Sequence, residues 1–256
     1  MENKENNNPL ELKEDIDSNK AIDILDDLNG IKSIKLWKKI TLFLTGCIGI
    51  SILAVFAGLI FYFVPMGEVE KDGAVSFVTY TALILSLAAI LNTDIFKLKI
   101  DLSKWKNWLI GIGIGAAMII FPIIYTTIVS TFYEYHINGN EESLRDIIDV
   151  YPVASVLIFG IVGPVCEELT YRVGLFGALS KKKWVAYLVS IIIFAMVHFT
   201  FTADNIYDEL VNLPVYVASG ALLAFAYDQF GLAASLSAHI TNNLYAVLVS
   251  IIGKYL

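Results

Sequence analysis

Charged residues and cysteines are both scarce in this sequence. Only 17% of its 256 residues are Asp, Glu, Lys or Arg, whereas 57% are hydrophobic, a balance far from that of average soluble domains. The only two cysteines, Cys47 and Cys166, lie in apolar stretches. A disulfide framework is therefore not indicated, and we expect Cys166 to be a small packing residue. The composition argues against a soluble domain and is typical of a polytopic membrane protein.

Several sequence signals are also missing. The first residues, MENKENNNPLELKEDID, do not show the basic, apolar and small-residue order of a cleavable signal peptide. No HExxH, GxGD or GxSG motif is present, which disfavours zincin-type, aspartyl and serine-histidine designs of intramembrane protease. No internal repeat is evident either, so the inverted-repeat signature of many secondary transporters is absent.

The net charge of -7 has a local origin. Nine acidic residues fall within the first 31 residues, and the rest of the chain is nearly neutral. We expect residues 1–31 to form an acidic, disordered cytoplasmic tail, with a short interfacial helix near AIDILDDL. The low isoelectric point therefore says little about a substrate.

Long apolar segments dominate the remaining chain. A helix needs about 20 mainly apolar residues to cross the bilayer core. By this measure the sequence predicts an all-α polytopic membrane bundle of about seven to eight transmembrane helices. The predicted spans are residues 40–64, 74–92, 107–131, 152–179, 184–201, 210–228 and 232–252. The third span has no charge, and its Gly111 and Gly115 form a small-xxx-small face suited to close helix packing.

Lysine placement predicts the orientation of these spans. Most lysines outside the tail lie in three clusters, at residues 32–39, 97–106 and 181–183, whereas the intervening loops are acidic or lack Lys and Arg. The positive-inside rule places all three clusters and the N-terminus in the cytoplasm. With seven spans the C-terminus lies outside. The segment TDIFKLKIDLSKWKNW is expected to be an interfacial anchor.

The fourth predicted span contains three ionisable residues. Insertion scales assign about 2.5 to 3.5 kcal/mol to each charge at a helix centre, so these side chains must face protein or water. Glu168 and Arg172 are four residues apart and can pair on one helix face. Glu167 points about 100° away and is left available. Gly163 and Pro164 predict a kink or close-packing point just before them.

Two later spans carry histidine. His198 follows Phe194 by four residues in the fifth span, and His239 precedes Asn243 by four in the seventh. A carboxylate beside histidines in a partly dry cavity suits activation of a water molecule, and His and Asn donors can stabilise an oxyanion. A second arrangement has Glu167, His198 and His239 binding Zn²⁺. The residues alone do not choose between the two.

Three short motifs stand in order on successive spans, and together they resemble those of the CPBP family of intramembrane proteases, also called the CAAX protease and bacteriocin-processing or Abi family. The matches are EELTYR to EExxxR (Glu167, Glu168, Arg172), FAMVH to FxxxH (Phe194, His198) and HITNN to HxxxN (His239, Asn243). The resemblance covers the fourth to seventh spans, whereas the first three spans match nothing specific.

The resemblance implies roles for these residues. Glu167 would activate water with the assistance of His198, while His239 and Asn243 would stabilise the oxyanion; Glu168, Arg172 and Phe194 would be supporting residues. The apolar segments predict N-terminal transmembrane helices with an interfacial segment over residues 32–149, and the resemblance implies a catalytic core over residues 150–256. The expected location is the bacterial cytoplasmic membrane.

The resemblance leaves the type of protease and its task open. Family members are often labelled metalloproteases, although a metal-free glutamate mechanism has been favoured for CAAX-processing members. Bacterial members act in bacteriocin immunity, peptide maturation or cell-envelope regulation. We expect a membrane-associated peptide or protein substrate, the lipid bilayer as surroundings and no nucleic acid partner. The alternatives are a non-catalytic membrane scaffold or immunity protein acting through a partner, and a proton-coupled transporter.

Overall fold

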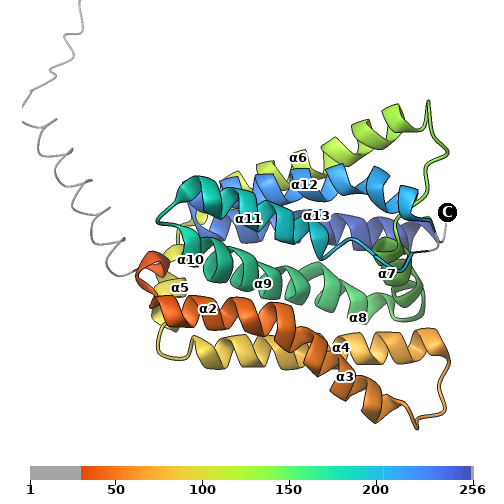
Figure 1. Cartoon of the computed structure of the whole chain (residues 1–256), viewed down its shortest axis with the longest axis horizontal. Helices are drawn as coiled ribbons and strands as arrows, with labels where there is room; N and C mark the ends of the chain where they lie inside the picture. The colour runs from red at the N-terminus through yellow and green to blue at the C-terminus, as the bar shows by residue number, and fades with distance from the viewer. Residues whose placement is uncertain (1–29, 204, 255–256) are drawn as a thin grey trace, which may run out of the picture.

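The computed structural model describes residues 30–203 and 205–254, and in these ranges it contains helices and no strand. The predicted interfacial helix near AIDILDDL and nearly all of the predicted tail lie outside the described residues. Within those ranges the elongated helices run side by side in one bundle (Figure 1). The all-α membrane fold predicted from the apolar stretches is confirmed.

Within the described part of the chain, six helical segments are long and apolar enough to cross a membrane. The first, Leu36–Phe61, joins α2 (Leu36–Leu44), the π-helix η2 (Thr45–Gly49) and α3 (Ile50–Phe61). The fourth, Pro152–Leu179, joins α8 (Pro152–Leu157), the π-helix η3 (Ile158–Val162), α9 (Gly163–Glu167), the π-helix η4 (Glu168–Phe176) and α10 (Gly177–Leu179). The others are α4 (Glu68–Ile90), α6 (Trp105–Val129), α12 (Ile206–Phe230) and α13 (Leu232–Gly253).

The prediction of seven to eight full spans was wrong. The fifth predicted span, 184–201, is the helix α11 (Lys183–Met196), which has only 14 residues and is about 21 Å long. That length is less than the roughly 30 Å of a bilayer core. The sequence stays apolar past Met196, since Phe199 and Phe201 follow, but the backbone there is no longer helical. The carbonyl of His198 is bonded instead by a side chain from elsewhere in the chain, that of Asn138.

The short helices lie at the ends of the bundle. One end carries η1 (Ile31–Ser33) and α5 (Ile95–Leu102), and α7 (Gly139–Val150) lies at the other end (Figure 1). The segment that contains α7 was expected to be an acidic loop. Its apolar residues Ile147 and Ile148 are buried against Phe159 and Val247, so a helix forms on an amphipathic pattern.

The three lysine clusters meet at the same end of the bundle (Figure 1). Lys38 and Lys97 both pair with the carboxylate of Asp94, and Lys39 donates to the carbonyl of Gly177 at 3.4 Å. Burial opposes ionisation of Asp94, but hydrogen bonds from the two lysines outweigh it and hold the pKa of this carboxyl below its ordinary value. The contacts tie the start of α2 to the turn after α4 and to α10.

Close helix packing in the bundle depends on the two glycines singled out in α6, which packs along α13. A Cβ atom at Gly111 would lie 2.2 Å from the carbonyl oxygen of Ala234, and one at Gly115 would lie 2.7 Å from that of Ala238. Both contacts are with backbone, which cannot rotate away. The predicted small-residue face is therefore confirmed as the place where α6 and α13 approach each other.

This packing predicts a difference between two glycines of one helix. Gly111→Ala should destabilise the protein by about 1 to 3 kcal/mol, because the added methyl group overpacks the contact with α13. Gly113→Ala is the matched control, since a Cβ there would meet nothing within 4 Å. Thermal unfolding of both variants in detergent measures the effect. Equal melting temperatures for the two variants would contradict this account of the helix contact.

Candidate active site

The fourth membrane segment, which carries the glutamate pair, is not a regular α-helix. The short α-helix α9 lies between the π-helices η3 and η4, and Pro164 stands in its first turn. The predicted irregularity before the glutamates is thus present, with Gly163 buried close to Tyr80. Wide π-type turns are common where a helix presents side chains to a functional site. Glu167 ends α9 and Glu168 begins η4, so the glutamate pair lies at the junction of the two helix types.

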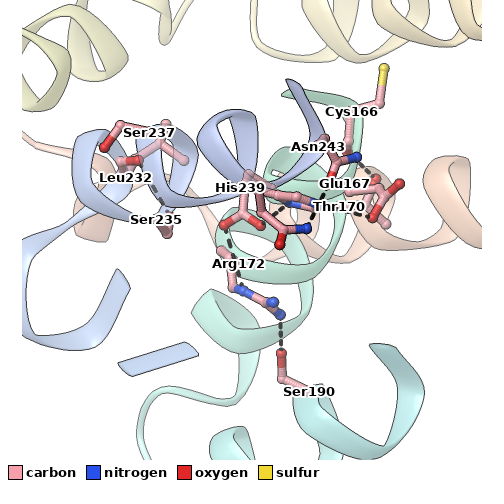
Figure 2. Close-up of polar contacts among 12 residues, drawn as sticks. Cys166, Glu167, Thr170, Arg172, Ser190, Leu232, Ser235, Ser237, His239 and Asn243 are labelled. Atoms are coloured by element: carbon pink, nitrogen blue, oxygen red, sulfur yellow. Dashed lines mark hydrogen bonds and ion pairs between the residues drawn. The ribbon is translucent and has the colours of Figure 1, made fainter. Parts of the chain in front are cut away.

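Glu168 is fully buried, and the side chains of Arg172 and His239 contact its carboxylate. Its Oε2 lies 3.5 Å from Nε of Arg172, so the predicted pair forms. Its Oε1 lies 3.0 Å from Nδ1 of His239. Arg172 is also fully buried; it donates from Nη1 to Ser190 Oγ at 2.8 Å and lies 5.0 Å from the ring centre of Phe194. Glu168 therefore joins the arginine of its own segment to the histidine of α13, and Figure 2 labels both of these partners.

Glu167 has a different environment. Its side chain keeps 19% of its surface exposed, and its Oε2 accepts no hydrogen bond from the described residues. That oxygen lies 3.7 Å from Nε2 of His239 and 3.9 Å from Nε2 of His198. These separations are too long for direct hydrogen bonds and are short enough for one bridging water, at about 2.8 Å for each of its hydrogen bonds. The structure thus brings the predicted carboxylate and both predicted histidines together.

In each histidine the second ring nitrogen, Nδ1, is bonded to another group of the protein. Nδ1 of His198 lies 2.7 Å from the carbonyl oxygen of Phe194, and Nδ1 of His239 lies 3.0 Å from the Glu168 carboxylate. A carbonyl or an ionised carboxylate only accepts, so in both rings Nδ1 carries the proton. In the neutral ring Nε2 is then unprotonated, and it faces Glu167. Each imidazole can therefore receive a proton at the atom nearest to the carboxylate.

The predicted supporting residue Phe194 packs among these groups. Its ring centre lies 4.8 Å from that of His198 and 5.8 Å from that of His239. Asn243 follows His239 on α13, but its amide nitrogen donates to the carbonyl of Phe159 at 3.2 Å and not to Glu167. Asn243 thus stands in the neighbourhood of the carboxylate (Figure 2), with its side chain oriented by the fourth segment.

A cavity of about 320 Å³ opens beside Glu167. Its wall is built from five parts of the chain, which supply Cys47, Tyr80, Asn140, Tyr171 and His198 among other residues. Both cysteines are free and Cys166 is buried, as expected for a packing residue, although it also contributes to this wall. The volume is at the lower end of the range for ligand pockets.

The chemistry of the donors would suit zinc, since a carboxylate and two imidazole nitrogens are ordinary zinc ligands. However, within residues 30–203 and 205–254 no group of three His, Cys, Asp or Glu side chains is spaced to hold a metal ion. The side chains of Glu167, His198 and His239 lie close together, but their spacing is not that of a metal centre. The chemistry derived below accordingly uses the residues of the chain.

Comparison with known proteins bears on the same segments. A family model described as type II CAAX prenyl endopeptidase Rce1-like matches residues 149–245. YxdF of Lactococcus lactis, a UPF0177 protein, is 30% identical over 129 residues, which cover 47% of this chain and 69% of that protein. The chain belongs to the CPBP family. All three motifs lie inside the matched residues.

Other relatives of this CPBP protein are bacterial. YdiL of Bacillus subtilis, a candidate membrane peptidase by its name, is 28% identical over 71% of this chain and 73% of its own length. The membrane-embedded CAAX protease MroQ of Staphylococcus aureus is 25% identical over 79% of this chain and 89% of its own length. No solved structure matches the chain. Family membership and the apolar helices together support a multi-pass membrane protein of an endopeptidase family.

Sequence reasoning missed several residues of the site. Tyr216 stacks on His198 with ring centres 4.7 Å apart, and Ser190 binds Arg172. Asn138 and Asn140 come from the segment that was expected to be a loop. One signal was present, because Asn138 followed three residues later by Glu141 is the pattern of a helix N-cap, and the Asn138 side chain accepts from the Glu141 amide at 3.0 Å.

The buried pair predicts unequal effects for two arginines. Arg172→Ala should destabilise the protein by about 3 to 5 kcal/mol, because it leaves the charge of Glu168 buried without its cation. Arg145→Ala is the matched control, since Arg145 pairs with Glu141 at the same spacing but is exposed, and its loss should change stability by less than about 1 kcal/mol. Detergent melting curves and expression levels would show the difference. Normal stability and activity of the Arg172 variant would refute a structural pair.

Proposed function

We propose that the protein is an intramembrane endopeptidase in which Glu167 activates a water molecule. The observation that carries this proposal is the unpartnered Oε2 of Glu167, which faces Nε2 of both His198 and His239 at the edge of a cavity. A general base needs an acceptor atom that is not already hydrogen-bonded within the protein. Oε2 of Glu167 has no such partner among the described residues. Membership of an endopeptidase family gives the reaction class.

The geometry supports a sequence of proton movements. Glu167 takes a proton from the water, and the hydroxide oxygen bonds to the carbonyl carbon of the scissile peptide. The carbonyl oxygen becomes an oxyanion. His239 can stabilise it by donating from Nε2 when the ring carries a proton on both nitrogens before the water attacks, and Asn243 is the proposed second donor. The proton then passes to the leaving nitrogen through Glu167 or His198 as the C–N bond breaks.

Glu168 has a separate part in this proposal. Its bond to Nδ1 of His239 fixes the ring orientation and the tautomer, as a carboxylate does for histidines in other active sites. Arg172 balances the charge of Glu168, so one carboxylate of the pair stays ionised as a support. Among the described residues no lysine or arginine pairs with Glu167, which we propose as the base.

The lysine-rich end is proposed to face the cytoplasm. All three clusters meet at one end of the bundle, whereas the C-terminus lies at the opposite end (Figure 1). The short helix α11 and the loop after it run from one end of the bundle to the other (Figure 1), which supports the sequence-based orientation with six long helices. The expected substrate is a membrane-associated peptide or protein.

Replacement of the base tests the activity. Glu167→Gln should lower cleavage of a peptide library by purified protein about 10²- to 10⁴-fold, because an amide cannot accept the proton of water. The melting temperature should stay close to that of the wild type. Glu142→Gln, an exposed change on α7, is the control and should cleave normally. Undiminished turnover by the Glu167 variant would eliminate its role as the base.

The same preparations distinguish the alternatives. Zinc bound in equal amount to the protein, with activity lost on chelation and restored by zinc, would replace the metal-free mechanism by one with Glu167, His198 and His239 as ligands. If the wild type cleaves nothing while its cellular phenotype survives Glu167→Gln and His198→Ala, the protein is instead a non-catalytic scaffold.

A further inference from the structure

His198 lies just beyond the end of its own helix. Helix α11 ends at Met196, and His198 is the second residue beyond it. Its amide still donates to the carbonyl of Ala195 at 3.2 Å, and its Nδ1 is bonded to the carbonyl of Phe194 in α11. Its own carbonyl lies past the last helical turn, and carbonyls at a helix end need partners from outside the helix. The backbone of His198 therefore depends on contacts with other segments.

Asn138, the N-cap residue of α7, supplies one of these contacts. Its side chain is 1% exposed, and its Nδ2 donates to the His198 carbonyl at 3.0 Å. Its Oδ1 accepts from the Glu141 amide at 3.0 Å and from the Tyr216 hydroxyl at 3.2 Å. The ring of Tyr216 lies nearly parallel to that of His198, at 19°. One buried amide thus holds both the backbone of His198 and the phenol that stacks on its ring.

Glu209 of α12 supplies a second bridge beside the first. This carboxylate is 1% exposed; it accepts from the Gly139 amide at 2.7 Å and from the Thr200 amide at 2.9 Å. Gly139 is next to Asn138, and Thr200 is two residues after His198. The two bridges therefore clamp the start of α7 to the loop that carries His198, and each involves a buried polar group that would be costly to leave unpaired.

We propose that Asn138 and Glu209 are positioning residues that hold His198 against Glu167. Asn138 lies outside the residues matched by the family model. The position of His198 is given by the structure, and the effect of that position on cleavage rests on the function proposed above. Asn140, two residues further along α7, lines the cavity together with His198 and Glu167. A shift of the start of α7 would accordingly alter both the imidazole and the cavity wall.

Two similar asparagines provide a matched test. Asn138→Asp keeps an acceptor for Glu141 and Tyr216 but removes the donor to His198. Asn212→Asp is the control, since Asn212 is also buried and donates to a loop carbonyl, that of His136, at 3.0 Å. Asn138→Asp should lower kcat on the order of 10- to 100-fold with KM nearly unchanged, because small displacements of catalytic groups have effects of this size. Asn212→Asp should leave both constants near wild type.

A second readout does not depend on cleavage. The rate of modification by diethyl pyrocarbonate, measured for each histidine by mass spectrometry, should rise several-fold at His198 in the Asn138→Asp variant and stay constant at His239. In Asn212→Asp it should not change at His198. Glu209→Gln, which replaces one acceptor by a donor, should resemble Asn138→Asp and serves if that variant does not fold.

The outcomes separate the two proposals. If the wild type cleaves no substrate, the proposed function fails, and the labelling rate of His198 alone decides whether the clamp exists. If the wild type cleaves and Asn138→Asp matches Asn212→Asp in kcat and in His198 labelling, the clamp is overturned while the function stands. A fall in melting temperature shared by both variants, without a change specific to His198, would likewise show that Asn138 is only structural.

Discussion

The buried charge of Glu168 constrains how the fourth segment, α11 and α13 are arranged. A carboxylate with no exposed surface inside a membrane bundle requires both a cation and hydrogen-bond donors. Arg172 and His239 meet that requirement from two different segments, and Ser190 in turn binds the arginine. The fourth segment, α11 and α13 are thereby tied around one buried charge. Loss of any member leaves another without its partner.

The two adjacent glutamates have different surroundings because consecutive residues of a helix point in different directions. Glu168 faces the buried arginine, whereas Glu167 faces the cavity and the two Nε2 atoms. Nδ1 of His239 bonds to the first glutamate and its Nε2 faces the second. The supporting carboxylate and the proposed base are therefore coupled through a single imidazole. This coupling explains why the structural pair and the reactive group occupy consecutive positions.

Much of this arrangement could be predicted from local patterns. Apolar length located the membrane helices, the spacing of four residues gave the pair of Glu168 and Arg172, and the small-residue face of α6 followed from Gly111 and Gly115. The three motifs stand in the order known from a protein family, and this order predicted that Glu167 and both histidines lie near one another. Each of these signals depends on neighbours along the chain or on one residue type at a fixed spacing.

The rest could not be predicted, because it depends on contacts between distant segments. Nothing near Met196 marks the end of α11; the residues beyond it are still apolar, and the carbonyl of His198 is bonded by a side chain 60 residues away. The acidic composition around α7 hid its amphipathic pattern. Only the spacing of Asn138 and Glu141, which is typical of a helix N-cap, indicated the helix α7. That spacing does not identify the segments that the helix contacts.

The shortness of α11 has a physical consequence for the N-terminal half. A helix that ended only at the far side of the membrane would have no free carbonyl beside Asn138, and His198 would be held by the helical ladder. Because the helix ends early, the carbonyl of His198 just beyond it must be bonded inside the protein, and the N-cap residue of α7 provides the donor. The backbone of His198 is therefore held by a contact with a distant segment as well as by its own helix. The segment before residue 150 therefore contributes to the geometry of the site, in addition to anchoring the protein in the membrane.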